Sequence, residues 1–295
     1  MHIILGGTGQ VGTAVARTLL ERGEPVTVVT RDRANAAGLE RLGAVVAEAD
    51  IRDVDRLRDV LRTGRRAFLL NPPADPSGDT DAEEKANVDA IMAALDGSAL
   101  EKVVLQSTYG AAPEEEYGGP AGDLTVLHLF EEQLRGQPIP VTINRGAYFM
   151  SNWTGMLGAV RESGTLPSFF PADLALPTVA PTDLGRAAAD RMMEDVGQSG
   201  LHHVEGPTRP TPRDVAGAFS RALDRPVEVA VIPREAWLDT FAQFGFSDAA
   251  ARSYARMTGA VVDGATAGPD DPERGMMDLD RYAREAVRAD GRRHR

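Results

Sequence analysis

A glycine-rich turn near the N-terminus constrains the fold of this chain more than any other sequence feature. Residues 1–35 read MHIILGGTGQVGTAVARTLLERGEPVTVVTRDRAN, which predicts a strand, a tight turn, a helix and a second strand. The spacing G-x-G-x-x-G runs from Gly7 to Gly12, and Gly6 adds another glycine. Because such glycines let the backbone approach a pyrophosphate at a helix N-terminus, we predict a dinucleotide site rather than a purely structural turn. The turn residues expected to contact the dinucleotide are Gly6, Thr8, Gly9, Gln10 and Val11.

The end of the second strand indicates which dinucleotide binds. NAD sites usually place Asp or Glu about 20 residues after the turn, where the carboxylate holds the ribose hydroxyls. This chain has Thr30 and Arg31 there, and Arg33 follows. A guanidinium binds a 2′-phosphate through two hydrogen bonds, whereas Asp32 comes one position late and would point to the other side of an extended strand. We expect NADP(H), with NAD(H) less favoured. The alternative is that Arg31 is a solvated loop charge.

Strand-like and helix-like segments alternate through the first two-thirds of the chain, which predicts a parallel sheet covered by helices. The expected strands are 2–5, 25–30, 44–47, 66–70, 102–106 and 140–144. The expected helices are 10–22, 34–42, 53–62, 81–96 and 124–135, the last with Asp123 as N-cap and Gly136 as its stop. The fold predicted is a Rossmann-type doubly wound α/β sheet with a smaller C-terminal α/β substrate lobe.

The rhythm changes after residue 150. Residues 163–183 are rich in proline and predict a long ordered loop with one short strand at most. A helix near 182–195 and a strand at 201–205 follow; 211–233 then predicts a capped helix and a strand, and the remainder is helical. We expect an NADP-binding domain over 1–150, rejoined by 178–205. The substrate lobe would comprise 151–177 and 206–295.

Composition excludes several classes of protein. The net charge of −12 argues against nucleic-acid binding, and the basic end GRRHR is predicted to be a frayed, solvated tail. No apolar run approaches the roughly 18 residues of a membrane span, and no secretory signal is evident. The absence of cysteine excludes disulfides and thiolate ligands, and His202 and His203 do not have metal-site spacing. We expect a cytoplasmic protein without a metal, acting away from membranes and nucleic acids.

Several segments together resemble a known protein family. ILGGTGQVG, VVAEADIRD, AFLLNPP, VLQSTYGA and FEEQLRGQPIPVTINRGAYFMSNW follow one another with the spacing seen in NmrA-like proteins. These are atypical members of the short-chain dehydrogenase/reductase superfamily. The segment HHVEGPTRPTPRDVAGAFSRALDRPVEVAVIP resembles their second lobe, so the resemblance covers nearly the whole chain. The run from Glu131 to Asn152 is more specific than the glycine turn, which many families share.

The resemblance implies further contacts with the cofactor. Those beside the adenine would be Asp50 and Ile51, and those near the adenosine ribose and pyrophosphate would be Asn71, Pro72 and Pro73. Residues at the end of the fifth strand, near the nicotinamide, would be Gln106, Ser107 and Thr108. The loop on the nicotinamide side, which would border the substrate pocket, comprises Arg145, Gly146, Ala147, Tyr148 and Phe149. Each of these residues also has an interpretation as ordinary loop or core structure.

The usual proton relay of short-chain reductases is missing. That relay is Tyr-x-x-x-Lys, in which the lysine lowers the pKa of the tyrosine. The residues four positions after the five tyrosines (109, 117, 148, 254 and 282) are Pro113, Ala121, Asn152, Thr258 and Ala286. The chain has lysine only at Lys85 and Lys102, so the relay cannot be built locally. A standard ketone–alcohol mechanism is therefore not expected.

His128 is the alternative proton carrier that the sequence offers. It lies where the superfamily has its active-site lysine, and helical spacing places it on one stripe with Leu124, Leu127 and Glu131, facing the sheet. Glu131 would orient the imidazole, which would bind the nicotinamide ribose or supply a proton. The alternative is a core histidine with satisfied hydrogen bonds.

Other polar and aromatic side chains join His128 as candidates. Ser107 and Tyr109 follow the fifth strand, where a substrate carbonyl would be polarised. Tyr148 and Phe149 offer flat surfaces to a planar ring, although ordinary packing is an alternative. The candidate catalytic residues are His128, Tyr148 and Ser107. Residues 113–119 predict a solvated loop, with a lid as the alternative.

Three functions remain open. The first is an NADPH-dependent oxidoreductase that transfers hydride to a quinone, an activated alkene or an imine. Such an acceptor needs little acid catalysis, so the protein need only hold a planar small molecule against the cofactor. The second is a non-catalytic NADP(H) sensor or regulator that acts through a protein partner, and the third is an isomerase or epimerase. The sequence is compatible with a homodimer.

Overall fold

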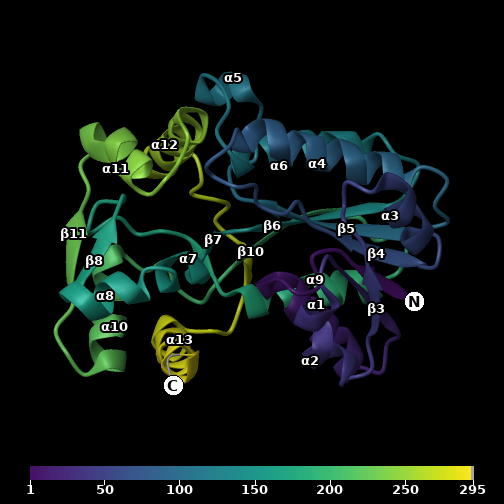
Figure 1. The fold of residues 1–295 in the computed structure, drawn as a ribbon, viewed down its shortest axis with the longest axis horizontal. Helices are drawn as coiled ribbons and strands as arrows, with labels where there is room; N and C mark the ends of the chain where they lie inside the picture. Colours follow the sequence, from purple (N-terminus) through teal and green to yellow (C-terminus); the bar gives the residue numbers. More distant parts are fainter. Residues whose placement is uncertain (294–295) are drawn as a thin grey trace.

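The computed structural model describes residues 1–293, and its centre is a sheet of eight parallel strands in the order β12-β10-β6-β5-β4-β1-β2-β3 (Figure 1). The strands are β1 (His2–Ile4), β2 (Val26–Thr30), β3 (Val45–Glu48), β4 (Arg66–Leu69), β5 (Lys102–Thr108), β6 (Val141–Gly146), β10 (Gly200–Glu205) and β12 (Glu273–Arg274). The strand order reverses at β1, which lies between β2 and β4. The predicted doubly wound α/β fold is confirmed.

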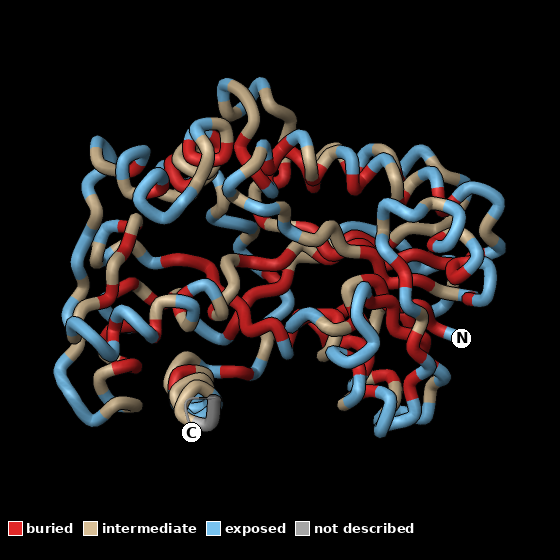
Figure 2. Tube along the Cα trace, viewed as in Figure 1, coloured by how far each residue is buried: buried red, intermediate tan, exposed pale blue. Residues whose placement is uncertain are grey.

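Helices cover both faces of this sheet (Figure 1). One layer comprises α1 (Gln10–Glu21), α2 (Ala37–Glu40) and α9 (Pro181–Met193); the other comprises α3 (Val54–Leu61), α4 (Thr80–Leu95) and α6 (Asp123–Arg135). Adjacent residues of β1 pack against different helix layers. Ile4 packs on the α1 side and Ile3 on the α4 side, because successive side chains of a strand point to opposite faces. Figure 2 shows that burial is concentrated in the strands between the two layers.

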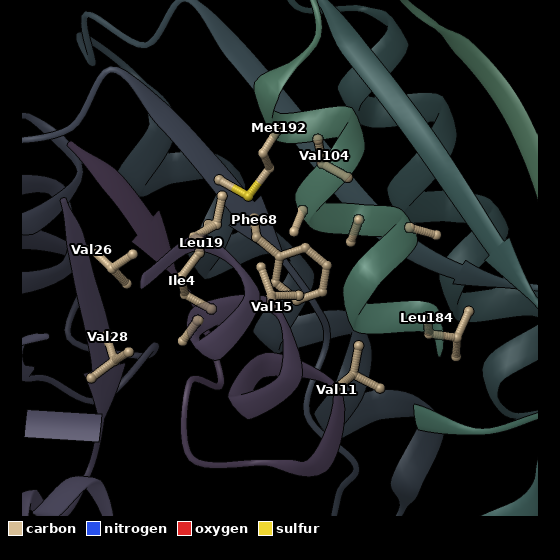
Figure 3. Packing of buried hydrophobic residues seen from close by; sticks show 14 of the residues in the cluster. Ile4, Val11, Val15, Leu19, Val26, Val28, Phe68, Val104, Leu184 and Met192 are labelled. Carbon is tan, nitrogen blue, oxygen red and sulfur yellow. The ribbon is translucent and has the colours of Figure 1, made fainter. Parts of the chain in front are cut away.

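Helices α1 and α9 pack so closely that one residue between them must be glycine. A Cβ atom on Gly185 of α9 would lie 2.3 Å from the Cβ of Ala14 and 2.8 Å from the backbone nitrogen of Val15. Figure 3 shows the apolar side chains that this approach encloses, among them Leu19 from α1, Met192 from α9 and Phe68 from the sheet. The packing fixes α1, and with it the glycine turn, against the sheet.

The C-terminal part of the chain forms a second body beside the sheet (Figure 1). Its elements are α7 (Met150–Thr154), α8 (Leu157–Ser163), β8 (Thr165–Ser168), α10 (Pro212–Leu223), β11 (Glu228–Val231), α11 (Trp237–Gln243), α12 (Asp248–Val262) and α13 (Leu279–Arg293). The two-stranded sheets β8–β11 and β7–β9, the latter of Tyr148–Phe149 and Thr178–Val179, are also parallel. Strand β12 lies in the main sheet, although the expected lobe boundaries had placed it in the substrate lobe.

Four local expectations were wrong. Asp123 is the first residue of α6 and its N-cap is Gly122, because the turn before α6 has φ of 54° at that position, which suits glycine. Residues Glu114–Tyr117 form the short helix α5 instead of a solvated loop. The proline-rich stretch holds two strands, β8 and β9, and α13 continues helical to Arg293. The remainder of the predicted tail lies outside the described residues. No helix in the described part of the chain is long and apolar enough to cross a membrane.

The close approach of α1 and α9 predicts the effect of one added methyl group. Gly185→Ala should lower the free energy of unfolding by about 1–3 kcal/mol, because the new Cβ overlaps with Ala14. The measurement is urea denaturation followed by circular dichroism. The control is Gly158→Ala in α8, where a Cβ meets nothing within 4 Å, so that stability should stay the same or rise slightly. If Gly185→Ala and Gly158→Ala change the free energy of unfolding by the same amount, the close packing of α1 on α9 does not require glycine.

Candidate functional site

The glycines of the N-terminal turn have two distinct roles. Gly6 has φ of +59°, a Cβ on Gly7 would lie 2.7 Å from Val28, and one on Gly12 would lie 2.2 Å from the carbonyl oxygen of Gly6. These three glycines therefore let the turn fold against the sheet. Gly9 is exposed, and its missing Cβ would meet only the Gly6 oxygen, at 3.3 Å. It is the member of the turn that leaves space for a ligand on the outside.

Helix α1 begins without a capping side chain. Its N-cap is Gly9, no side chain accepts from its first amide groups, and its first turn has no acidic residue. A capping side chain is present at the start of α3, α4, α10 and α12, whereas α6 to α9 and α11 lack one, as α1 does. The first amides of α1 are thus left as donors beside the exposed glycine, at the point where the strand order reverses. This arrangement fits a bound pyrophosphate.

A shallow depression of about 410 Å³ lies beyond the ends of β2 and β3. Its lining residues are Arg31, Glu48, Ala49, Asp50, Asp53 and Arg56. Arg31 is exposed and has no hydrogen bond or ion pair within the described part of the chain, so its guanidinium is available to a ligand. Arg33, in contrast, pairs with Glu40 and does not line the depression.

Two further residues lie near the ends of β2 and β3, and the sequence analysis gave neither of them a role in binding. Asp32 caps the short 3₁₀ helix Arg33–Ala36, where its carboxylate accepts from the backbone N–H of Ala34 at 2.9 Å. It is therefore a structural cap. Arg56 was missed by the sequence reasoning, although Asp53 three residues earlier predicts the helix start that places it here.

The loop after β4 is held by Glu84 of α4. The side-chain carboxyl group of Glu84 accepts from the backbone N–H of Ala74 at 3.0 Å. The backbone carbonyl of Glu84 accepts from the side-chain amide of Asn71 at 3.2 Å. The side-chain oxygen of Asn71 is buried without a partner in the described structure, which leaves an acceptor for a ligand hydroxyl beside the turn. Pro72 is half-buried and Pro73 exposed. The expected contacts of this loop remain predictions.

Glu84 titrates abnormally. Burial, followed by the charge of Asp123, raises the pKa of Glu84 to about 8, and the hydrogen bond from Ala74 only partly opposes this. The side chain of Glu84 is therefore protonated in the folded protein at neutral pH, while the unfolded chain would ionise near 4.5. A raised carboxyl pKa means that stability falls as the pH rises from about 4.5 to about 8.

Replacing Glu84 by a residue that cannot ionise should abolish the loss of stability between pH 4.5 and pH 8. Glu84→Gln keeps an acceptor for Ala74 but cannot ionise, so the variant should nearly equal the wild type at pH 4.5 and exceed its free energy of unfolding at pH 8, by about 4 kcal/mol. Denaturant titrations at both pH values measure this. Glu83→Gln, one position away and 40% exposed in an ion pair with Arg52, should show no such gain. A variant that is less stable than the wild type at pH 8 would refute the assignment.

The ends of β5 and β6 are joined by a buried ion-pair network. Glu131 is fully buried and accepts from the Ser107 hydroxyl at 2.5 Å, from Arg145 at 2.7 Å and 2.8 Å, and from Arg135 at 2.9 Å. Burial acts to raise the pKa of Glu131, but the hydrogen bonds from Arg145 and Ser107 outweigh it and hold the pKa below its usual range. Arg145 and Ser107 thus fix the two strands. The hydroxyl of Ser107 is engaged inside the protein, and its catalytic role stays an untested prediction.

The remaining residues of the fifth strand divide between core and surface. Gln106 is buried and clasps Asn144 of β6, donating to its carbonyl oxygen at 2.9 Å and accepting from its side-chain amide at 3.1 Å. Thr108 is half-exposed. Tyr109 is 2% exposed because the ring packs under Gly268, and burial strongly raises the pKa of its phenol. A phenol so enclosed cannot polarise a substrate carbonyl.

His128 lies half-buried on α6. Its Nδ1 is buried without a partner in the described structure. The expectation that Glu131 orients its ring was wrong, since Ser107 and the two arginines occupy the Glu131 oxygens. The unpartnered nitrogen fits a residue that completes its hydrogen bonds with a ligand, and this role remains a prediction.

The loop after β6 has both core and half-exposed residues. Gly146 and Ala147 are buried, and a Cβ on Gly146 would lie 2.9 Å from Leu184. Phe149 is half-buried against the α1 side of the sheet core. Tyr148 is half-exposed and meets Trp153 and Phe170 edge to face, with ring centroids 5.5 and 5.3 Å apart. Burial raises the pKa of Tyr148 to about 12, although a hydrogen bond with Asn152 opposes it, so the phenol stays neutral at physiological pH.

The network around Glu131 predicts a large and pH-dependent effect. Glu131→Gln should cost about 3–5 kcal/mol of unfolding free energy at pH 7, because Arg145 keeps a charge without its partner. Because the pKa of Glu131 is lower in the folded protein than the unfolded value near 4.5, its ionised form stabilises the fold above that pH. The difference in unfolding free energy between wild type and variant should therefore become smaller as the pH falls below 4.5. Denaturation at pH 7 and below pH 4 measures this. Glu132→Gln removes an exposed pair with Arg135 and should change little. A gap that does not vary with pH would speak against the ion pair.

Comparison with known proteins finds the same architecture. The sequence pattern of the NmrA-like family matches residues 2–262. An NAD(P)H azoreductase from Xenophilus azovorans is 25% identical over 236 residues, which are 80% of this chain and 78% of the azoreductase. The Escherichia coli NADPH-dependent quinone oxidoreductase QOR2, complexed with NADPH, superimposes with a TM-score of 0.77 at 18% identity over 97% of this chain and 99% of its own. NmrA, a negative transcriptional regulator in complex with NADP, gives 0.72 at 17% identity over 99% and 97%.

Proposed function

The chain belongs to the NmrA-like family, and from this premise we propose that it is an NADPH-dependent reductase of planar, conjugated acceptors such as quinones. The observation that carries the proposal is the exposed glycine turn with the uncapped amides of α1, flanked by the unpaired guanidinium of Arg31. The azoreductase and the quinone oxidoreductase support the choice of reaction, because both use a nicotinamide cofactor with conjugated acceptors.

NADPH bound in this turn would supply a hydride, and a quinone that takes the hydride and one proton becomes a hydroquinone. The described fold provides no tyrosine–lysine relay for a harder acceptor. Lys85 pairs with Glu114, Lys102 is fully buried beside Glu194, and Tyr109 is sealed. A quinone suits this site because its reduction is driven by the acceptor itself.

The protein's own residues would then bind and orient. The first amides of α1 hold the pyrophosphate, and Arg31 holds the 2′-phosphate. The ring of Tyr148 would offer a flat wall to the acceptor, and its phenol, with a pKa raised to about 12, is a weaker acid than an ordinary tyrosine. His128, once protonated, would donate that proton to the reduced acceptor and return to neutral imidazole.

A second candidate is a regulator that binds NADP(H) without turnover. The burial of Ser107 and Tyr109 favours it, because both hydroxyls expected to polarise a substrate carbonyl are enclosed in the protein. The likeness of the fold to NmrA agrees with this candidate. Its partner would be another protein, since the acidic chain disfavours nucleic acid.

Oxidation of NADPH with a panel of quinones, followed by nicotinamide absorbance, separates the two candidates. We expect steady turnover. Tyr148→Phe should keep nearly wild-type kinetics because a phenol with a pKa raised to about 12 is a weak proton donor, whereas Tyr148→Ala should raise the KM for the quinone roughly two- to tenfold through the loss of the ring. His128→Ala should lower kcat and change its pH dependence. Tight NADPH binding without turnover across the panel would favour the regulator instead.

A further inference from the structure

Two hydrogen-bond donors near Tyr148 are buried without an acceptor. They are the indole Nε1 of Trp153 and the hydroxyl group of Thr178, and neither has a hydrogen-bond partner in the described structure. Trp153 is 3% exposed, and Thr178 is fully enclosed. A buried donor without a partner lowers the stability of a fold, so two of them beside one ring call for an explanation.

The fold brings both donors against the ring of Tyr148. Tyr148 and Thr178 are register partners in the parallel pair β7–β9, so their side chains lie on the same face of that pair. The ring of Trp153 meets that of Tyr148 edge to face, with centroids 5.5 Å apart, and Phe170 packs against both rings. The backbone here is fixed, because the N–H of Tyr148 donates to the carbonyl oxygen of Pro177 at 3.0 Å.

Tyr148 is the member of this aromatic group that solvent reaches. It is half-exposed, whereas Trp153 and Phe170 are buried. Tyr148 follows β6 at the carboxyl edge of the main sheet, the edge on which the glycine turn also lies. Its phenol forms a hydrogen bond with Asn152, which is exposed. The side chain can therefore turn about its Cα–Cβ bond at the cost of one bond that water replaces.

We propose that Trp153 and Thr178 are specificity-determining residues that recognise an acceptor atom at the edge of the planar substrate. When the ring of Tyr148 turns aside, the indole N–H and the hydroxyl group donate to that atom, for which a quinone carbonyl oxygen is suited. This oxygen gains negative charge as the hydride reaches the quinone ring, so both hydrogen bonds strengthen during the reduction. The inference rests on the proposed reduction of planar acceptors.

Thr178→Val deletes one donor and keeps the shape of the side chain. It should raise the melting temperature, because it removes a hydroxyl group without a partner, and lower kcat/KM for a quinone about fivefold. The control is Thr142→Val in β6, where the buried hydroxyl donates to the carbonyl oxygen of Gln198 at 3.3 Å. In that variant the melting temperature should fall and kcat/KM should not change. The dissociation constant of NADPH, measured by fluorescence, should stay the same in both.

A matched pair of variants tests the indole donor. Trp153→Phe and Trp237→Phe lose the same part of a buried side chain, but the Nε1 of Trp237 donates to the carbonyl oxygen of Ile232 at 3.0 Å. Trp153→Phe should therefore lower the melting temperature less than Trp237→Phe does. Of the two, Trp153→Phe alone should lower kcat/KM for the quinone.

Three results would overturn the inference. Unchanged kcat/KM in Thr178→Val and Trp153→Phe would mean that no acceptor reaches the two donors. A fall in the melting temperature of Thr178→Val would mean that its hydroxyl already has a partner, such as an ordered water. Weaker binding of NADPH would assign the donors to the cofactor. If the wild type oxidises no NADPH with any quinone, the proposed function fails and the inference with it, whereas variants that match an active wild type refute the inference alone.

Discussion

The parallel hydrogen bonding of β1 with both β2 and β4 is the constraint on which the rest of this structure depends. Parallel strands all end at one edge, and the order of strands reverses at β1, so the connections on its two sides diverge there. The divergence opens the space into which α1 points its amides. Close packing of α1 on α9 then keeps those amides in place. The sheet therefore determines where the N-terminus of α1 lies, and the free amides of that terminus give the site its partial positive charge.

Much of the fold could be predicted because the signals are local. The alternation of strand-like and helix-like segments placed the first six strands but not the short β7, and the glycine spacing placed the turn. The site was harder to predict because its key contacts are distant in sequence. Glu131 was matched with His128, three residues away, but its partner is Arg145 on another element. Nothing near Tyr109 in the sequence indicates that Gly268 covers it. Helical spacing shows which residues share a face, not which partner competes for their atoms.

The arrangement of buried groups agrees with the proposal that the acceptor is not an ordinary ketone. Gln106 joins β5 to β6 through Asn144, and the Ser107 hydroxyl donates to the buried Glu131 of α6. Stability and reactivity make opposite demands on such groups, because a hydroxyl that donates to a buried carboxylate is costly to release. These contacts support the proposal of an acceptor that is reduced readily without strong acid catalysis.

The last two strands of the main sheet are far along the chain from the others. Strands β1 to β6 come from the first half of the chain, whereas β10 is Gly200–Glu205 and β12 is Glu273–Arg274. During synthesis from the N-terminus, the outer edge of β6 therefore emerges with its backbone unpaired while roughly fifty more residues are added. An open edge is a template for pairing with another chain. The newly made protein is thus most exposed to misassociation in the interval between β6 and β10, well before its last helix exists.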